Sequence, residues 1–180
     1  MKALRIVLVL ALISVFSAGT LSFFELLAEK RIAENEKREI EESIFTIVPQ
    51  TEKIEEVKDY YKLFDKEGNL LGYIFLAEGQ GYQGPVKILF GLKPNLEELL
   101  GIEIISHQET PGLGAKIDSQ EFKQQFRRLK VLPKIEYLKK KPSLPNQIQA
   151  ITGATVSSRS VVNILNKKID QIRKEFNKKR

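Results

Sequence analysis

Residues 147–158 read Gln-Ile-Gln-Ala-Ile-Thr-Gly-Ala-Thr-Val-Ser-Ser. This stretch predicts the end of the last strand of the chain and the connection to its last helix. Residues 147–151 are predicted to form a short strand. After them, apolar residues recur at spacings of 4, 4, 3 and 4, which predicts a helix with one buried stripe made of Val161, Leu165, Ile169, Ile172 and Phe176.

The loop between this strand and this helix, Thr152–Ser158, combines a glycine with several hydroxyl groups. Glycine lets a ligand approach the backbone closely. The unpaired N–H groups and the positive dipole end of a helix N-terminus favour a phosphate. Plain capping is the alternative, in which Ser157 or Ser158 satisfies the first-turn amides and nothing binds. On the local pattern alone, capping is the commoner use of such residues.

Four segments that precede this loop in the chain carry strand patterns: Lys58–Asp65, Leu71–Glu78, Val86–Leu92 and Ile102–His107. Gly68-Asn69 supplies a turn, and residues 79–85 contain too many glycines for a strand interior. Ser119 is predicted to cap a short helix with Phe122 and Phe126 on one face. Because strands and helices do not strictly interleave, we expect an α+β fold, a twisted and mainly antiparallel sheet packed on helices.

A second loop that exposes functional groups follows the strand that ends at His107. Pro111 and two glycines are expected to form a tight turn that exposes Leu113 and the preceding carboxylate, Glu109. His107 and Glu109 make a poor metal pair because no third ligand accompanies them. A serine hydrolase is equally poorly supported, because no G-x-S-x-G sequence surrounds any serine.

The N-terminal region differs from the rest of the chain. Residues 6–24 contain no charge and no proline, and about 28 Å of helix, at about 1.5 Å per residue, would match the hydrocarbon core of a bilayer. We expect a retained transmembrane anchor over residues 1–24, a helical stalk over 25–49 and one domain over 50–180. The alternative interpretation of the apolar segment is a cleaved signal peptide. Lys2 and Arg5 place the N-terminus in the cytoplasm and the domain outside.

Composition narrows the possible chemistry. The chain has no cysteine and one histidine, which excludes disulfides, thiolate nucleophiles, iron–sulfur clusters and a histidine-rich zinc site within one chain. Any redox role therefore requires an organic cofactor. The net charge of +6 is concentrated in basic stretches with few aromatic residues, so solvated faces or contacts with anionic lipid are expected rather than nucleic-acid binding.

Three segments, in order, resemble signatures of the FMN-binding domain family. Residues 152–155, Thr-Gly-Ala-Thr, are similar to its flavinylation signature; residues 109–114 resemble its second signature, and residues 81–87 resemble its glycine-rich hairpin. A four-residue match alone is weak, but three ordered matches after an N-terminal anchor are specific. Within the family the chain is most like the G subunit of Rnf electron-transport complexes, which is related to the C subunit of the sodium-translocating NADH:quinone oxidoreductase.

This resemblance implies a membrane-anchored electron carrier in which a separate flavin transferase esterifies FMN, through its phosphate, to Thr155. It implies partner subunits in a membrane complex, no metal and no catalytic side chain. Leu113 is expected to pack on the flavin ring, and Glu109, Thr110 and Lys116 to make polar contacts. The other residues expected around the cofactor are Thr152, Gly153, Ala154, Val156, Ser157, Ser158, Gly112 and Gly114.

One position departs from the family pattern. Gln149 stands where members often carry an aspartate, which puts the efficiency of modification at Thr155 in question. Two other functions stay open at this stage. A free-standing exported flavoprotein would share every motif. A pilin-like structural protein would also have an apolar N-terminal helix, but its acidic residue lies early in that helix, whereas Glu25 closes this one.

Overall fold

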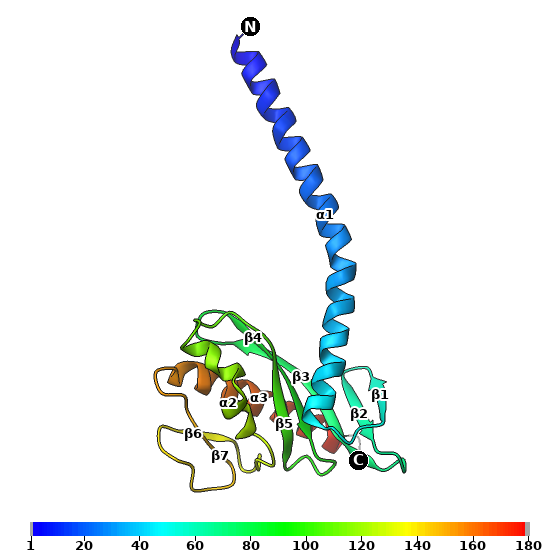
Figure 1. Cartoon of the computed structure of the whole chain (residues 1–180), viewed down its shortest axis with the longest axis vertical. Coiled ribbons are helices and arrows are strands. Elements are labelled where there is room, and N and C mark those ends of the chain that lie inside the picture. Colours follow the sequence, from blue (N-terminus) through cyan, green and yellow to red (C-terminus); the bar gives the residue numbers. More distant parts are fainter. Residues whose placement is uncertain (1, 179–180) are drawn as a thin grey trace. The chain divides into compact units, whose positions relative to one another are not determined.

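The computed structural model describes residues 2–178, with the backbone alone described for nine residues in helices. In chain order the elements are α1 (Lys2–Ile47), β1 (Lys53–Val57), β2 (Tyr60–Phe64), β3 (Leu70–Gln80), β4 (Pro85–Leu92), β5 (Leu99–His107), the 3-10 helix η1 (Gly114–Asp118), α2 (Gln120–Gln124), β6 (Glu136–Leu138), β7 (Gln147–Gln149) and α3 (Thr155–Lys178) (Figure 1). The mixture of an antiparallel sheet and helices confirms the α+β prediction.

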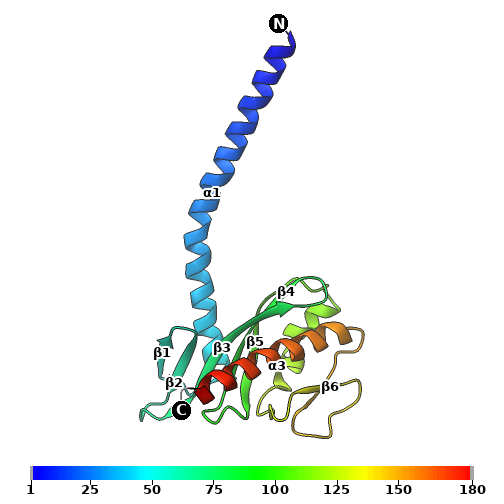
Figure 2. The same cartoon turned by 180° about the vertical axis from the view of Figure 1, so that it is seen from behind.

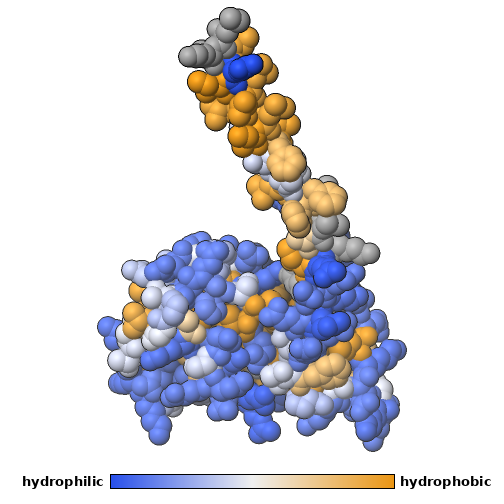
Figure 3. Space-filling model, turned by 45° about the horizontal axis from the view of Figure 1, so that its top comes forward, coloured by the Kyte–Doolittle hydropathy of each residue, from blue (hydrophilic) through white to orange (hydrophobic). Residues whose placement is uncertain are grey.

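The first part of α1 is long and apolar enough to cross a membrane. The segment Leu4–Glu25 spans 22 residues, and its described side chains are exposed. In Figure 3 apolar side chains cover this part of the helix, whereas the domain surface in the same view is mainly hydrophilic. The helix continues without a break through the predicted stalk and ends at Ile47, two residues before Pro49. An exposed apolar stretch of this length is typical of a membrane anchor.

The last turns of α1 belong to the domain. The chain divides into two compact units, residues 1–39 and residues 40–180, so the domain begins ten residues before the expected boundary at residue 50. The cause is a stripe of four buried side chains, Ile40, Ile44, Ile47 and Val48. This stripe packs with Leu63, Ile74 and Leu89 of the sheet.

The main sheet is a meander in which β1 to β5 lie side by side in chain order and every neighbouring pair is antiparallel. Sequence patterns missed β1, because two adjacent glutamates interrupt its alternation. They also placed Gly79 outside a strand, whereas it pairs with Val86 inside β3. A Cβ at Gly79 would lie 2.6 Å from Cγ1 of Ile164, so glycine here permits close packing of α3 on the sheet.

The two faces of the sheet bury different elements. Phe75, Ala77 and Phe90 face a large core that includes the apolar stripe of α3, while Ile74 and Leu89 face the last turns of α1. Figure 2 shows α3 lying along the sheet. The predicted stripe of α3 is confirmed, since its first four members are buried and Phe176 packs half-buried against the same core. This packing fixes the N-terminus of α3 beside one end of the sheet.

A short helix and its buried lysine hold the segment that follows β5. Ser119 caps α2 as predicted, its Oγ accepting a hydrogen bond from the Phe122 N–H at 3.4 Å. The Lys123 ammonium lies 2.5 Å from Glu103 on β5 and 3.0 Å from Asp118 of η1. Burial lowers the pKa of Lys123, but its bonds to Glu103 and Asp118 outweigh burial, so this pKa lies above its ordinary value.

Lys123→Met is expected to lower the free energy of unfolding by about 2–4 kcal/mol at neutral pH, because it leaves a mostly buried carboxylate without its partner. Since the pKa of Lys123 is raised, its contribution is fully present below the ordinary lysine pKa and is lost as the pH rises through the raised value. Urea unfolding of the wild type and the variant at neutral and strongly alkaline pH would measure this. A difference that did not shrink at alkaline pH would contradict the ion-pair account.

Candidate functional site

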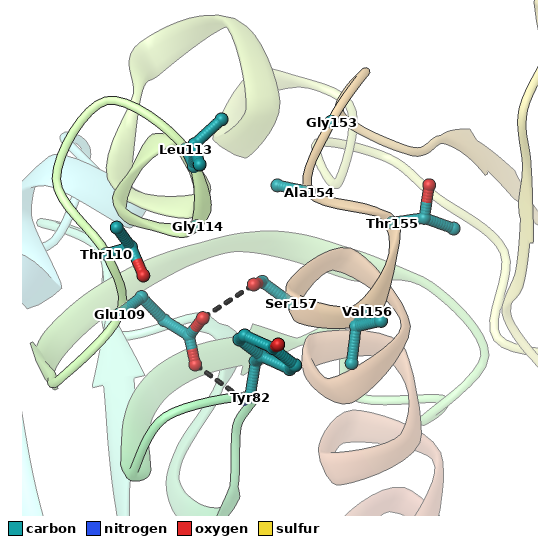
Figure 4. A pocket seen from close by; sticks show the side chains of 10 residues that line it. All are labelled: Tyr82, Glu109, Thr110, Leu113, Gly114, Gly153, Ala154, Thr155, Val156 and Ser157. Carbon is teal, nitrogen blue, oxygen red and sulfur yellow. Dashed lines mark hydrogen bonds between the residues drawn. The ribbon is translucent and has the colours of Figure 1, made fainter.

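A cavity of about 400 Å³ lies where the β3–β4 hairpin, the loop after β5 and the first turn of α3 meet (Figure 4). Its lining comes from three segments that are far apart in the sequence. The residues are Tyr82, Glu109, Thr110, Leu113, Gly114, Gly153, Ala154, Thr155, Val156 and Ser157. These three segments are the ones that carry the three sequence signatures, at residues 81–87, 109–114 and 152–155.

The Glu109 carboxylate joins these three segments. Its Oε1 accepts hydrogen bonds from the backbone N–H of Tyr82 at 2.6 Å and of Gln83 at 3.3 Å. Its Oε2 accepts a bond from the Ser157 hydroxyl at 2.6 Å. Glu109 is only 4% exposed, so these donors replace the water that would otherwise solvate its charge. Glu109 therefore acts as an internal tie, and its oxygens are already engaged.

Two glycines of the signatures make room for this carboxylate. A Cβ at Gly81 would collide with Oε1 of Glu109, and a Cβ at Gly114 would collide with Oε2. At Gly114 the added carbon would also lie 2.8 Å from the Ser157 hydroxyl. The two glycines are therefore needed for the close approach of the segments, and neither has a positive φ.

The first turn of α3 presents unpaired donors to the cavity. The helix begins at Thr155, inside the segment Thr152–Ser158 that the sequence predicted to be a loop. Within residues 2–178, the N–H groups of Thr155, Val156 and Ser157 and the hydroxyl of Thr155 have no hydrogen-bond partner. Such a turn favours an anion, through both its free N–H groups and its dipole.

Ser158, rather than Ser157, organises the loop before this turn. Its hydroxyl accepts a bond from the Ile151 N–H at 3.0 Å and donates to the Ala154 carbonyl at 3.0 Å. Gly153 has a φ of +83°, a conformation that glycine adopts without strain. Neither serine accepts a bond from a first-turn amide of α3, because Ser158 serves Ile151 and Ser157 donates to Glu109, so the capping interpretation is wrong and the groups at Thr155 stay available to a ligand.

The structure brings together most, though not all, of the residues predicted to surround the cofactor. Ser158 is fully buried behind the cavity, and Gly112 lies in the adjoining turn with a φ of +76°. Thr152 and Lys116 line a neighbouring cavity of about 690 Å³ instead. Tyr82 was not among the predicted site residues, although its place in the glycine-rich hairpin signature could have indicated it.

Three side chains give the cavity an apolar rim. Tyr82 is 63% exposed, Leu113 51% and Val156 39%. Large apolar side chains are rarely left exposed together on a domain without a ligand or partner. Their grouping at one mouth makes this cavity the candidate binding site.

Among the described residues no third metal ligand joins His107 and Glu109, and the groups of a serine hydrolase are not paired. His107 uses Nδ1 to accept a bond from the Glu109 N–H at 3.2 Å. Ser157 donates to the Glu109 carboxylate, so it is not paired with the histidine base that a hydrolase would require. Glu109 is therefore committed to holding the three segments together.

Glu109→Leu is expected to destabilise the domain by about 3 kcal/mol, since hydrogen bonds to a charged acceptor contribute about 1.5–3 kcal/mol each and buried donors would be left unpaired. Chemical unfolding followed by circular dichroism would measure the loss. The exposed Glu121 is a matched control, and Glu121→Leu is expected to change stability by less than about 0.5 kcal/mol. Equal effects of the two substitutions would contradict the role assigned to Glu109.

The comparison with known proteins covers all three segments. The FMN-binding domain family matches residues 81–170. The G subunit of the ion-translocating oxidoreductase complex of Methanosarcina acetivorans is 31% identical over 180 residues, covering 93% of each chain. The G subunit of the proton-translocating ferredoxin:NAD(+) oxidoreductase complex of Clostridium ljungdahlii is 33% identical over 120 residues, covering 67% of this chain and 63% of that protein.

Two solved structures share the fold. NqrC of Shewanella oneidensis superposes with a TM-score of 0.55 at 19% identity, covering 59% of this chain and 52% of that one. The C subunit of the Na(+)-translocating NADH-quinone reductase of Parabacteroides distasonis gives a TM-score of 0.52 at 26% identity, covering 60% and 58%. The chain therefore belongs to the FMN-binding domain family and, over nearly its whole length, resembles the G subunit of ion-translocating oxidoreductase complexes.

Proposed function

We propose that this protein is the membrane-anchored electron-carrier subunit of an ion-translocating ferredoxin:NAD oxidoreductase complex of the Rnf type, and that it carries FMN as a phosphoester on Thr155. The observation that carries the proposal is the Thr155 hydroxyl. It lies at a cavity mouth, on a helix N-terminus, without a hydrogen-bond partner in residues 2–178. A hydroxyl available for bonding beside free N–H groups suits an esterified phosphate.

The residues of the cavity fit such a group. About 400 Å³ is within the range of small-molecule sites, and the opening leaves room for part of the ligand to extend beyond the walls. The N–H groups of residues 155–157 would stabilise the single negative charge of a phosphodiester by about 0.3–1 kcal/mol. Leu113, Tyr82 and Val156 offer apolar surface to the flavin ring.

Bound FMN supplies reversible electron transfer, which no side chain of this chain provides. The protein's part is to hold and surround it. The Thr110 hydroxyl lies in the lining and accepts a bond from the Gln83 side chain at 2.8 Å, which leaves its own proton free to donate. Glu109 acts on the site through Tyr82 and Ser157, and Lys116 lies on the neighbouring cavity. Of the three polar contacts expected from the sequence, Thr110 is thus the one best placed to touch the ring.

We expect the anchor to hold the domain outside the cytoplasm and the covalent bond to keep the cofactor on that domain. Leu4–Glu25 would span the cell membrane, with Lys2 and Arg5 holding the N-terminus in the cytoplasm and the domain outside. A cofactor outside the cytoplasm is not resupplied once lost, and an ester bond prevents that loss. A flavin transferase would attach the group during maturation, and other members of the complex would deliver and accept the electrons.

The test is the mass of the protein after co-expression with a flavin transferase. Trypsin releases residues 141–159 as one peptide, because Pro142 protects Lys141, and the hydroxyl residues of this peptide are Ser143, Thr152, Thr155, Ser157 and Ser158. We expect the FMN adduct on this peptide, with fragmentation placing it on Thr155. A chain that keeps its unmodified mass, or an adduct elsewhere, would overturn the proposal.

A further inference from the structure

A glutamine outside all three signatures holds the segment that leads to Thr155. Gln125 follows directly after α2, and its carboxamide pairs with the backbone of Gln149 in both directions. The Gln149 N–H donates to Oε1 of Gln125 at 2.7 Å, and Nε2 of Gln125 donates to the Gln149 carbonyl at 3.2 Å. A side chain here makes the two bonds that a neighbouring strand would otherwise make.

This pairing lies on one edge of β7. The other edge of β7 pairs in parallel with β6, where Gln149 is opposite Leu138, and the Ala150 N–H continues that pairing to the Leu138 carbonyl at 2.7 Å. At Gln149 the chain is therefore held from both sides. Beyond it, Ser158 holds residues 151 and 154 from within α3 itself. Gln125 thus ties the approach to Thr155 to the α2 side of the domain.

The segment after Gln149 is held in place and is also accessible to solvent. Gln149, Thr152 and Gly153 are exposed, and Gln125 and Gln149 both line the cavity of about 690 Å³ that adjoins Thr152. The core packing of α2 comes from Phe122 and Phe126, which are buried, whereas Gln125 is half-buried. Removing the Gln125 carboxamide therefore takes away the hold on one side of Gln149 without removing a core side chain.

We propose that Gln125 is a positioning residue for the modification of Thr155, acting through the backbone of Gln149; this rests on the proposed function. Transfer of a phosphoryl-linked group to a hydroxyl requires that hydroxyl at a defined place, and a displacement of about 1 Å can cost about a hundredfold in rate. In the transfer, Thr155 Oγ forms a bond to the flavin-side phosphorus of FAD, the phosphoanhydride bond breaks, AMP leaves, and the hydroxyl proton is lost to solvent. Gln125 touches none of these atoms.

The experiment measures the initial rate of flavin incorporation into the detergent-solubilised 180-residue chain, with FAD and a purified flavin transferase, by flavin fluorescence of the protein band. Gln125→Leu removes both bonds at similar volume, and we expect a rate roughly 10- to 100-fold lower. Gln125→Glu keeps the acceptor for the Gln149 N–H and is expected to restore part of the rate. Gln124→Leu, an exposed neighbour, is the matched control and should stay within about twofold of wild type.

A second readout separates positioning from general destabilisation. Amide hydrogen exchange at Gln149 is expected to rise about tenfold in Gln125→Leu, while exchange in the middle of α3 stays unchanged. If Gln125→Leu speeds amide exchange throughout the domain, the folded Gln125→Glu variant is used in its place. A rate of flavin incorporation below that of the wild type in Gln125→Glu supports the inference, and a rate equal to that of the wild type overturns it.

The two proposals fail in different ways. A wild-type chain that takes up no flavin contradicts the ester on Thr155. A wild-type chain that is modified, together with a Gln125→Leu variant modified equally fast despite faster exchange at Gln149, contradicts only the role of Gln125.

Discussion

Thr155→Ala is expected to give a chain that carries no covalent flavin when it is produced with a flavin transferase. The substitution removes the Oγ atom that would form the ester, so the loss should be complete rather than partial. Mass spectrometry of the intact chain and in-gel fluorescence would both report it. An adduct that persists in Thr155→Ala would show that another residue accepts the group.

Two variants make this result specific. Thr155→Ser keeps a hydroxyl at the same place and is expected to retain modification, at a lower rate because serine has more rotamer freedom. Thr152→Ala removes a hydroxyl three residues earlier, whose side chain lines the other cavity, and modification should persist. Since the Thr155 hydroxyl has no hydrogen-bond partner in residues 2–178, Thr155→Ala should change stability by less than about 0.5 kcal/mol. Loss of the flavin would then reflect chemistry rather than unfolding.

The second large effect concerns where the domain begins. A chain that starts at residue 50, the boundary expected from the sequence, is predicted not to fold, whereas one that starts at residue 40 should. The shorter chain lacks four buried side chains, those of Ile40, Ile44, Ile47 and Val48. At about 1.5–3 kcal/mol for each buried apolar side chain, their loss removes at least about 6 kcal/mol. That is comparable to the total stability of a typical domain.

Thermal unfolding followed by circular dichroism would compare the two chains. A chain that starts at residue 26 is the control, and it should match the one that starts at residue 40, since the compact unit begins there. A cooperative transition at the same temperature for the chain that starts at residue 50 would mean that the last turns of α1 contribute little. Ile44→Ala in the longer chain offers a smaller test, with an expected loss of about 2–5 kcal/mol because Ile44 is fully buried.

Gln149 illustrates how the tertiary structure changes the meaning of a sequence feature. Gln149 stands where the family often has an aspartate, and a flavin transferase that reads this position would read its side chain. The structure leaves this side chain exposed and uses the Gln149 backbone N–H and carbonyl as the partners of Gln125. The identity of residue 149 and the position of the segment are therefore separable in experiments.

The sequence by itself determined the features that depend on neighbours along the chain. The apolar run of the anchor, the stripe of α3, the cap at Ser119 and the turn after Asp65 are local patterns, in which a period or a side-chain bond extends over a few residues. The three signatures indicated the cavity for the same reason, because each is a short contiguous motif.

Only the tertiary structure decided the features that join distant residues. Glu109 reaches Tyr82 across 27 positions and Ser157 across 48, and Gln125 reaches Gln149 across 24. No local period marks such contacts, so the sequence predicted an exposed Glu109 carboxylate where the structure shows a buried tie, and it did not indicate Gln125. The last turns of α1 were assigned to a stalk for the same reason. Their apolar residues become a domain stripe only when the sheet, built from residues 53–107, provides the surface that buries them.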